Sequence, residues 1–288
     1  MPPPGSQSPP GDGILLVDKA AGETSYDVVR RTKRIAGRKK VGHAGTLDPF
    51  STGLLIVMLG RGTKLMPFLM EGPKRYRAEV LLGVETDTQD PEGRVVEEKA
   101  VPELTRDRVE GALERFVGEI EQVPPAFSAV HVEGTRAYKL ARKGLDVRMQ
   151  SRRVVIHAID LLSVDPPRLS LDVRCSSGTY VRSLARDLGR ALGTVGHLAG
   201  LRRIASGSFR VEEALASGLL YGEEGRKKLG EHLIPLPRAL PDMASVCIGR
   251  AMAARIRNGY HPARAEIMPA RRNTDAAGRL VQLLCDGE

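Results

Sequence analysis

Apolar and polar residues alternate along several stretches of this chain, a pattern that is typical of β-strands with one buried face. The alternation is strict over residues 169–175 and recurs over residues 76–82. Residues 153–162 also read as a strand, and the continuous apolar run at 54–59 suits a strand inside the core. The sequence therefore predicts a sheet built from several separate segments.

Other stretches carry their apolar residues at helical spacing. The apolar side chains of residues 28–36 fall on one face, and Thr24-Ser25 precedes them as a candidate helix cap. Residues 105–120 follow the same spacing, residues 137–142 predict a short helix, and a further helix follows the turn at Gly178. These segments predict helices that pack one face against the sheet.

Strands and helices follow one another without a regular βα alternation, which indicates an α+β fold with a mixed, largely antiparallel sheet. The Pro, Gly and Ser content of residues 1–12 predicts a disordered tail. Prolines at positions 235, 237 and 241 predict a linker. The expected organisation is thus a main domain at 13–240 and a small, strand-rich C-terminal module at 241–288.

Charge and cysteine content narrow the function classes. The 288 residues contain 44 lysines and arginines against 35 aspartates and glutamates, a net charge of +9, and such an excess attracts polyanions. The three cysteines form no CxxC pair, which fits a reducing, cytoplasmic location. No run approaches the about 20 apolar residues of a membrane span, so no membrane partner is expected.

The positive charge is concentrated in and after the first predicted helix. Seven basic residues occur in the eleven positions 30–40: Arg30, Arg31, Lys33, Arg34, Arg38, Lys39 and Lys40. A solvated helix face is the plain alternative. The density and single sign of these charges favour a surface that binds RNA phosphates.

The stretch VGHAGTLDP at 41–49 places one carboxylate, Asp48, beside these charges. Pro49 restricts the backbone of Asp48 to extended angles, while Gly42 and Gly45 allow tight turns and close approach of a ligand. Asp-Pro is also a common turn starter, so Asp48 is either an Asx turn or cap, or a group that acts on a polyanion. The residues alone leave both readings open.

Several other kinds of chemistry find no motif in this sequence. The six histidines never lie within four residues of one another, and neither an HExxH motif nor a His–Cys cluster occurs, so no metal site is expected. A GxSxG elbow is absent, and GRGTKL at 60–65 lacks the spacing of a phosphate loop.

A family resemblance decides the reading of Asp48. The segment VGHAGTLDPFSTGLLIVMLGRGTKL is similar to the catalytic loop of the bacterial TruB-type tRNA pseudouridine synthases. The likeness continues in order through GILLVDKAAGETSYDVV, KRYRAEVLLGVETDTQDPEG, QVPPAFSAVHVEGTRAYKLARKG and CSSGTYVRSLARDLGRALGTVGHLAGLRR. It spans about residues 13–210 and implies the pseudouridine synthase fold, with helices flanking the sheet.

The resemblance implies a reaction as well as a fold. The family converts uridine 55 in the T loop of tRNA into pseudouridine without a cofactor, and the target base must be flipped out of its stack. By this resemblance Asp48 corresponds to the nucleophile, and Arg182 is the guanidinium that keeps it charged in a desolvated pocket. Tyr76 matches the tyrosine that stacks on the flipped uracil; removal of the carbon-5 proton is a second role left open.

The remaining predicted site residues are carried over in the same way. Tyr180 and Leu201 match positions that line the base pocket, and both are also compatible with ordinary core packing. His43 matches a histidine that packs against the T loop. Lys19 matches a lysine near the active site, with an expected structural or electrostatic role.

The resemblance also implies the partners. We expect tRNA, through its T arm, as the macromolecular partner, no small-molecule cofactor, and a monomer. The short C-terminal segment resembles the family's RNA-binding PUA module only vaguely. A synthase that acts on another structured RNA, or an inactive RNA-binding or chaperone protein, are the alternatives; the joint presence of Asp48, Tyr76 and Arg182 argues against the inactive protein.

Overall fold

The computed structural model describes residues 11–267 and 281–285, except for residues 129, 133, 142 and 146. Within this part of the chain an eleven-stranded sheet forms the framework. Its main path runs in the order β14-β1-β3-β12-β4-β11-β10-β7, and β2, β13 and β15 pair at the side of this path. The strands are β1 (Gly13–Lys19), β2 (Val41–Ala44), β3 (Thr52–Leu59), β4 (Lys74–Leu82), β7 (Gly118–Gln122), β10 (Arg152–Asp165), β11 (Arg168–Cys175), β12 (Gly196–Ser206), β13 (Phe209–Arg210), β14 (Leu215–Ala216) and β15 (Ile234–Pro235).

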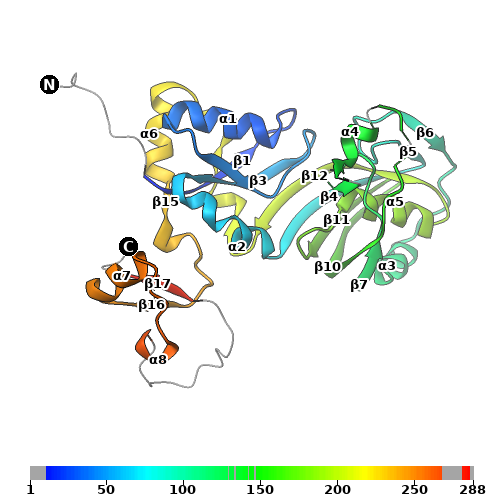
Figure 1. The fold of residues 1–288 in the computed structure, drawn as a ribbon. Helices are drawn as coiled ribbons and strands as arrows, with labels where there is room; N and C mark the ends of the chain where they lie inside the picture. Colours follow the sequence, from blue (N-terminus) through cyan, green and yellow to red (C-terminus); the bar gives the residue numbers. More distant parts are fainter. Residues whose placement is uncertain are drawn as a thin grey trace.

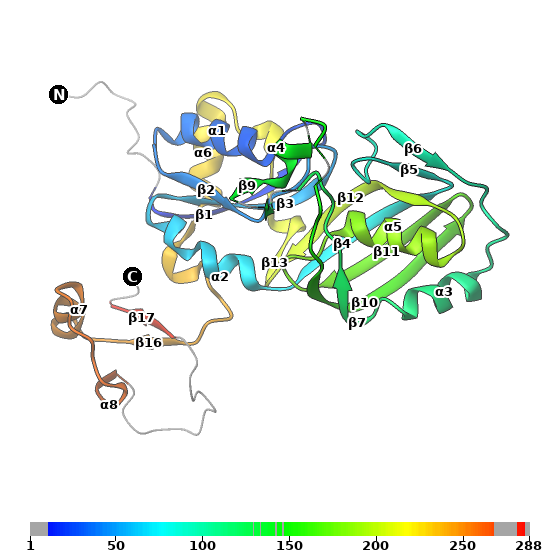
Figure 2. The same ribbon diagram turned by 45° about the vertical axis from the view of Figure 1, so that its right-hand side comes forward.

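Helices flank this sheet in both views (Figures 1 and 2). They are α1 (Ser25–Ala36), α2 (Met66–Glu71), α3 (Arg106–Glu114), α4 (Ala137–Ala141), α5 (Val181–Ala191), α6 (Gly222–His232), α7 (Arg250–Arg257) and α8 (Arg264–Ile267). Short 3₁₀ turns are η1 (Gly60–Leu65), η2 (Val211–Glu213), η3 (Ser217–Leu219) and η4 (Leu236–Arg238). Three small strand pairs complete the described chain: β5 (Val84–Thr86) with β6 (Val95–Glu98), β8 (His131–Val132) with β9 (Thr135–Arg136), and β16 (Ser245–Cys247) with β17 (Gln282–Leu284).

Most neighbouring strands of the large sheet are antiparallel, and only the pairs β1–β14 and β12–β3 are parallel. The predicted α+β class with a mixed, largely antiparallel sheet is therefore confirmed. The apolar run at 54–59 lies in β3, whose alternate side chains enter two separate cores, one on each face of the sheet. In the described chain no helix is long and apolar enough to cross a lipid bilayer.

The first helix begins and ends where the sequence indicates. Thr24 Oγ1 accepts a hydrogen bond from the Asp27 backbone N–H, and the Asp27 carboxylate accepts one from the Thr24 N–H, both at 3.0 Å. This reciprocal pair satisfies N–H groups that the first helical turn leaves free. Gly37 ends the helix in the left-handed conformation at φ 62°. Val28 and Ile35 are buried on the face that meets the sheet.

The prediction of one helix over residues 105–120 is wrong at its C-terminal end. Helix α3 stops at Glu114, and residues 118–122 form strand β7 on the edge of the sheet. Gly118 adopts φ 101°, which a right-handed helix does not allow, and β7 pairs with β10 instead. Ile120 still packs against the core, so its apolar spacing has a strand origin.

The predicted linker is packed rather than free. Ile234 and Pro235 form β15, which pairs with Ile14 and Gly13 of β1, and Ala239 is completely buried. The described part of the C-terminal segment, drawn below α2 in both views, holds the three-residue strands β16 and β17 and the helices α7 and α8. Helix is therefore the larger part of the structure described there, in contrast to the strand-rich module expected. The domain boundaries and the PUA-like character of this segment stay predictions.

Candidate active site

Asp48 lies in the loop of residues 45–51 that joins β2 to β3; we call this segment the Asp48 loop. The loop is fixed at its centre by Ser25, the first residue of α1. The Ser25 hydroxyl accepts a hydrogen bond from the Leu47 N–H at 2.9 Å and donates one to the Leu47 carbonyl at 3.1 Å. Because Leu47 is also buried, the residue before Asp48 is held by both packing and hydrogen bonds.

Lys19 fixes the loop from the end of β1. Its side chain is completely buried, and Nζ donates to the carbonyls of Ala20, Glu23 and Pro49 at 2.9, 2.7 and 3.1 Å. Burial lowers the pKa of Lys19, while the carboxylates of Glu23 and Asp48 act in the opposite direction. Lys19 therefore joins the turn after β1 to the residue that follows Asp48.

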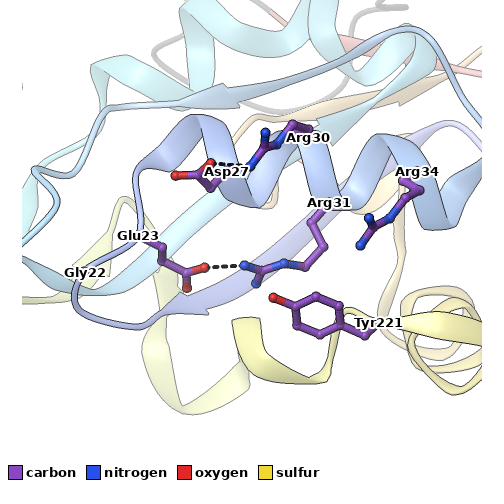
Figure 3. Close-up of a pocket in the computed structure, with 7 residues that line it drawn as sticks. All are labelled: Gly22, Glu23, Asp27, Arg30, Arg31, Arg34 and Tyr221. Carbon is purple, nitrogen blue, oxygen red and sulfur yellow. Dashed lines mark hydrogen bonds and ion pairs between the residues drawn. The ribbon is translucent and has the colours of Figure 1, made fainter.

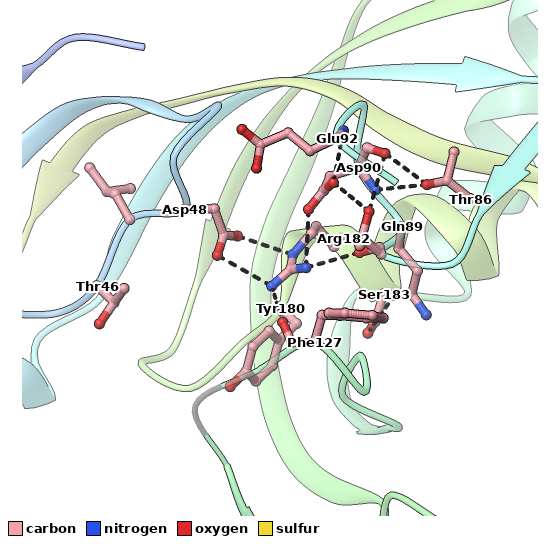
Figure 4. A network of polar contacts seen from close by, with 12 residues as sticks. Thr46, Asp48, Thr86, Gln89, Asp90, Glu92, Phe127, Tyr180, Arg182 and Ser183 are labelled. Carbon is pink, nitrogen blue, oxygen red and sulfur yellow. Dashed lines mark hydrogen bonds and ion pairs between the residues drawn. The ribbon is translucent and has the colours of Figure 1, made fainter. Parts of the chain in front are cut away.

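Arg182, in the first turn of α5, meets Asp48 from the other side of the site (Figure 4). Nε lies 3.0 Å from Asp48 Oδ2 in a bent ion-pair contact, and Nη2 donates to Asp48 Oδ1 at 3.3 Å. Nη1 lies 3.2 Å from Asp90 Oδ2 and donates to the Thr88 carbonyl at 2.9 Å, and Nη2 donates to the Phe127 carbonyl at 3.0 Å. One buried guanidinium thus joins two carboxylates and two loops.

The charge balance around Asp48 is set by burial and by its neighbours. Burial raises the pKa of Asp48, and the negative charge of Asp90 raises it further, while Arg182 and Lys19 oppose both effects. The pKa of Glu92 is also raised, by burial first and then by Asp90 and Asp48. A third of the Asp48 side chain remains exposed (33%), so the carboxylate is accessible to a ligand from solvent.

Tyr76 lies on β4, directly opposite Arg203 of β12. Its side chain is buried, and burial raises its pKa, an effect that the charge of Arg203 opposes. The Asp48 carboxylate adds to the rise of the Tyr76 pKa. The buried state fits a residue that is part of the wall of the site.

Tyr180 is the residue before α5, so its backbone is fixed together with Arg182. The Tyr180 N–H donates to Gln122 Oε1 at 2.8 Å, and Gln122 Nε2 donates to the Tyr180 carbonyl at 3.1 Å. The Arg152 guanidinium lies 5.0 Å from the centre of the ring. In Figure 4 the Tyr180 ring lies beside the Asp48–Arg182 pair, and its role in lining a base pocket stays a prediction.

His43 and Leu201 lie on the strands that surround this site. His43 is opposite Val57 in the β2–β3 pair, and its pKa is lowered by burial and by the charge of Arg203. Leu201 is opposite Ala78 in the β12–β4 pair and packs, partly buried, against the larger core.

Sequence reasoning missed Arg203. This arginine is 2% exposed, and its guanidinium donates to the Leu54 carbonyl at 2.6 Å, the Gly45 carbonyl at 3.0 Å and the Thr46 carbonyl at 3.5 Å. Arg203 therefore holds the first two residues of the Asp48 loop, Gly45 and Thr46, through their backbone carbonyls. Arginine is rarely buried to this extent. In the sequence Arg203 is simply the second of two consecutive arginines, and nothing in that local pattern predicts that its side chain is buried.

Asp90 was missed for a different reason. It is 4% exposed, and besides the contact with Arg182 its Oδ1 accepts hydrogen bonds from the Thr88 hydroxyl at 2.5 Å and the Glu92 N–H at 3.1 Å. Its segment, TDTQDPEGR, is rich in turn-forming residues and reads as a plain loop. Its burial and its contact with Arg182 distinguish this aspartate from Asp87, which is more exposed and lies near Arg94.

The predicted phosphate surface is partly neutralised within the protein. Arg30 pairs with Asp27 at 2.8 Å, Arg31 with Glu23 at 2.7 Å and Arg38 with Asp12 at 2.8 Å. The other four residues of the surface are Lys33, which is half-buried, and the exposed Arg34, Lys39 and Lys40. No group of three or more His, Cys, Asp or Glu side chains in the described segments is arranged to hold a metal ion.

Two family models match this chain in succession. The "TruB family pseudouridylate synthase (N terminal domain)" model matches residues 33–181, and the "tRNA pseudouridylate synthase B C-terminal domain" model matches residues 182–241. The chain belongs to the TruB family. Together the two matches include the Asp48 loop, Asp90 and Arg182.

Two proteins named tRNA pseudouridine synthase B are similar to this chain over most of their length. tRNA pseudouridine synthase B of Geotalea uraniireducens is 44% identical over 252 residues, which cover 88% of this chain and 81% of that protein. tRNA pseudouridine synthase B of Solibacter usitatus is 41% identical over 281 residues, which cover 96% of this chain and 95% of that protein.

The TruB-family fold is also found in solved structures. A chain of the Cbf5-Nop10-Gar1 complex superimposes with a TM-score of 0.71 at 26% identity, covering 96% of this chain and 75% of that one. A chain of an H/ACA RNP bound to a substrate RNA containing 2′-deoxyuridine gives a TM-score of 0.68 at 25% identity, with the same coverage.

Proposed function

We propose that this chain isomerises uridine 55 in the T loop of tRNA to pseudouridine, with Asp48 as the nucleophile. Membership of the TruB family supports the general reaction, conversion of a tRNA uridine to pseudouridine. The single observation that supports the role of Asp48 is its bidentate contact with the buried Arg182, in a carboxylate that is still one-third exposed.

The main chemical requirement of the proposed reaction is an ionised carboxylate held beside the target nucleotide. The bond from N1 of the base to C1′ of the ribose breaks, a bond from C5 to C1′ forms, and the proton of C5 is replaced by one on N1. Attack of a carboxylate on the sugar, its addition to the uracil ring, and an elimination that removes a ribose proton each require an ionised acid. Asp48 is the exposed end of the carboxylate–guanidinium network and is accordingly placed to act.

In this proposal Arg182 keeps Asp48 ionised when RNA covers the site. When RNA covers the site, Asp48 loses the remaining water, and desolvation disfavours its charged form. A guanidinium at 3.0 Å opposes that effect, and because Arg182 is itself buried, its charge is only weakly screened. The flipped base then needs flat walls, which Tyr76 and Tyr180 provide in this proposal.

Release of tritium from carbon-5-labelled uridine in a T-arm stem-loop tests the proposal. We expect release by the wild-type protein, because the carbon-5 proton is lost only when the base is rejoined through C5. Replacement of uridine 55 by cytidine, with the label in the other uridines of the loop, is the matched control and is expected to give no release. A protein that bound the stem-loop but released no tritium would instead be an RNA-binding protein without this activity.

A further inference from the structure

A pocket of about 610 Å³ opens between α1 and the residues that lead into α6 (Figure 3). Three arginines of α1 line it, together with Tyr221, Glu23 and Asp27. None of the contacts of Asp48 described above involves these side chains. The pocket is therefore separate from the Asp48–Arg182 network.

Two of the three arginines are already paired, and one is not. Arg30 and Arg31 form ion pairs with Asp27 and Glu23, and Arg31 Nη1 also donates to the Ser217 carbonyl at 2.8 Å. Arg34 makes no side-chain hydrogen bond or ion pair with any residue that the structure describes, and in Figure 3 its guanidinium extends toward the Tyr221 side of the pocket. The pocket thus presents one uncompensated positive charge to an incoming anion.

Tyr221 gives the pocket an aromatic wall. Tyr221 is 50% exposed, and the Arg31 guanidinium lies 4.5 Å from the centre of its ring. Because Arg31 is held by Glu23 and Ser217, it also limits where the ring can move. A partly exposed aromatic ring beside a free guanidinium is the arrangement with which proteins hold a nucleotide, through stacking on the ring and a contact to the phosphate.

One residue that lines the pocket is hydrogen-bonded to the Asp48 loop. Gly22, which lines the pocket, donates its backbone N–H to the Pro49 carbonyl at 2.9 Å, and Pro49 follows Asp48. The same Pro49 carbonyl accepts the hydrogen bond from Lys19. One backbone hydrogen bond therefore joins the lining of this pocket to the residue that follows Asp48.

We propose that this pocket binds a second nucleotide of the same RNA, with a phosphate on Arg34 and the base or ribose on Tyr221. The inference rests on the proposed RNA substrate and adds a binding subsite outside the base pocket. The contact between Arg31 and Tyr221 also joins α1 to α6, so a purely structural role is the competing explanation. That role predicts a loss of thermal stability with no change in RNA binding.

Affinity for an unlabelled T-arm stem-loop, measured over a range of salt concentrations, tests the subsite. Arg34→Gln is expected to weaken binding and to reduce the slope of log affinity against log salt by about 1, because one phosphate contact is lost. Tyr221→Leu is expected to weaken binding about tenfold with little change in slope, because stacking is not a charge contact. Tyr221→Phe keeps the ring and is expected to bind within about twofold of wild type.

Arg168→Gln is the matched control, since Arg168 is exposed at the start of β11 and its loss also removes one positive charge. Equal binding by Arg34→Gln, Tyr221→Leu and this control would overturn the subsite, and so would a fall in melting temperature of Tyr221→Leu with unchanged affinity. Failure of the wild type to bind the stem-loop would overturn both proposals. If the wild type binds the stem-loop, tritium release distinguishes the two proposals. Tritium release by the wild type, with RNA binding by Arg34→Gln and Tyr221→Leu unchanged, would reject the subsite and leave the proposed activity intact.

Discussion

Arg182 is the residue on which the geometry of the site depends most. Its Nε and both Nη atoms are engaged, by Asp48, Asp90 and the carbonyls of Thr88 and Phe127. Both Nη atoms donate hydrogen bonds, and Nε faces Asp48 in an ion-pair contact, so this set of partners fixes the rotamer of the buried arginine. The fixed arginine in turn leaves Asp48 little freedom to rotate away from the site.

Replacement of Arg182 by lysine tests that dependence. Lysine keeps the charge but lacks the planar fork, so it cannot contact Asp48 and Asp90 in the same way. We expect Arg182→Lys to lower the single-turnover rate of pseudouridine formation by about 100-fold or more, with RNA affinity within a few-fold of wild type. Arg153→Lys, at a side chain that is 77% exposed, is the control. A rate for Arg182→Lys close to that of this control would show that the fork is not needed.

The raised pKa of Asp48 predicts the acid side of the pH–rate profile. An acid whose pKa is raised becomes protonated, and inactive as a nucleophile, at a higher pH than an ordinary aspartate with a pKa of 3.8. As the pH is lowered, the rate should therefore begin to fall at a pH above 3.8. Asp90→Asn removes a neighbouring negative charge that raises the pKa of Asp48. We therefore expect the acid limb of the single-turnover profile to move to lower pH in this variant, even though its plateau falls. Movement of the limb to higher pH would contradict the assignment.

The Asp48 loop is held by three secondary-structure elements besides the two strands that it joins. Lys19 of β1, Ser25 of α1 and Arg203 of β12 each bond to a different backbone group of the loop, which itself joins β2 to β3. Directly after the loop, strands β3 and β12 approach each other closely at Gly53. A Cβ added at Gly53, whose φ is 102°, would lie 2.3 Å from the Arg203 carbonyl oxygen.

This close approach predicts a large effect of a single methyl group. Gly53→Ala must push β3 away from β12 and adopt a positive φ, so we expect the free energy of unfolding to fall by about 2 kcal/mol or more. Gly111→Ala is the matched control, because Gly111 lies in α3 with no atom within 4 Å of the added Cβ, and it is expected to stabilise the protein slightly. Denaturant unfolding of both variants measures the difference; equal stability would mean that the two strands can separate without cost.

Local pattern predicted those elements whose burial repeats along the chain. The strands β3, β4 and β11 and the helix α1 were evident because alternation, helical spacing and the Thr24 cap are properties of neighbouring residues. The end of α3 was not predicted, because β7 is defined by its pairing with β10 and its apolar residues also fit a helix. Arg203 and Asp90 were missed because both act through contacts with residues more than 90 positions away in the sequence, Arg203 with Leu54 and Asp90 with Arg182.

The strand order of the sheet explains how separate sequence segments meet. Along the path β1-β3-β12-β4, Lys19, the Asp48 loop, Leu201 and Tyr76 come from adjacent strands or their ends. The start of α5, with Tyr180 and Arg182, then closes the site. Composition and residue spacing could not predict that these residues meet in one site. The family resemblance could, because it assigns all these positions to the same site.

The net charge of +9 is only partly available to RNA. In the surface at residues 30–40, Arg30, Arg31 and Arg38 are paired with acids of the same chain, and Arg34, Lys39 and Lys40 are exposed. Sequence counting treated all seven residues as equal, since ion pairs between distant segments such as Arg38 and Asp12 cannot be read from a local pattern. The affinity for RNA should therefore depend more on Arg34, Lys39 and Lys40 than on the three arginines that pair with acids of the same chain.

The central claim is that Asp48 is the nucleophile of a tRNA uridine isomerase, and the most direct test is single-turnover conversion of a T-arm stem-loop by Asp48→Asn. Asparagine has nearly the same shape but no charge, so the variant is expected to bind the stem-loop within a few-fold of wild type. We expect no pseudouridine at position 55 from this variant, against complete conversion by wild type. Formation of pseudouridine by Asp48→Asn at a rate within about tenfold of wild type would contradict the account.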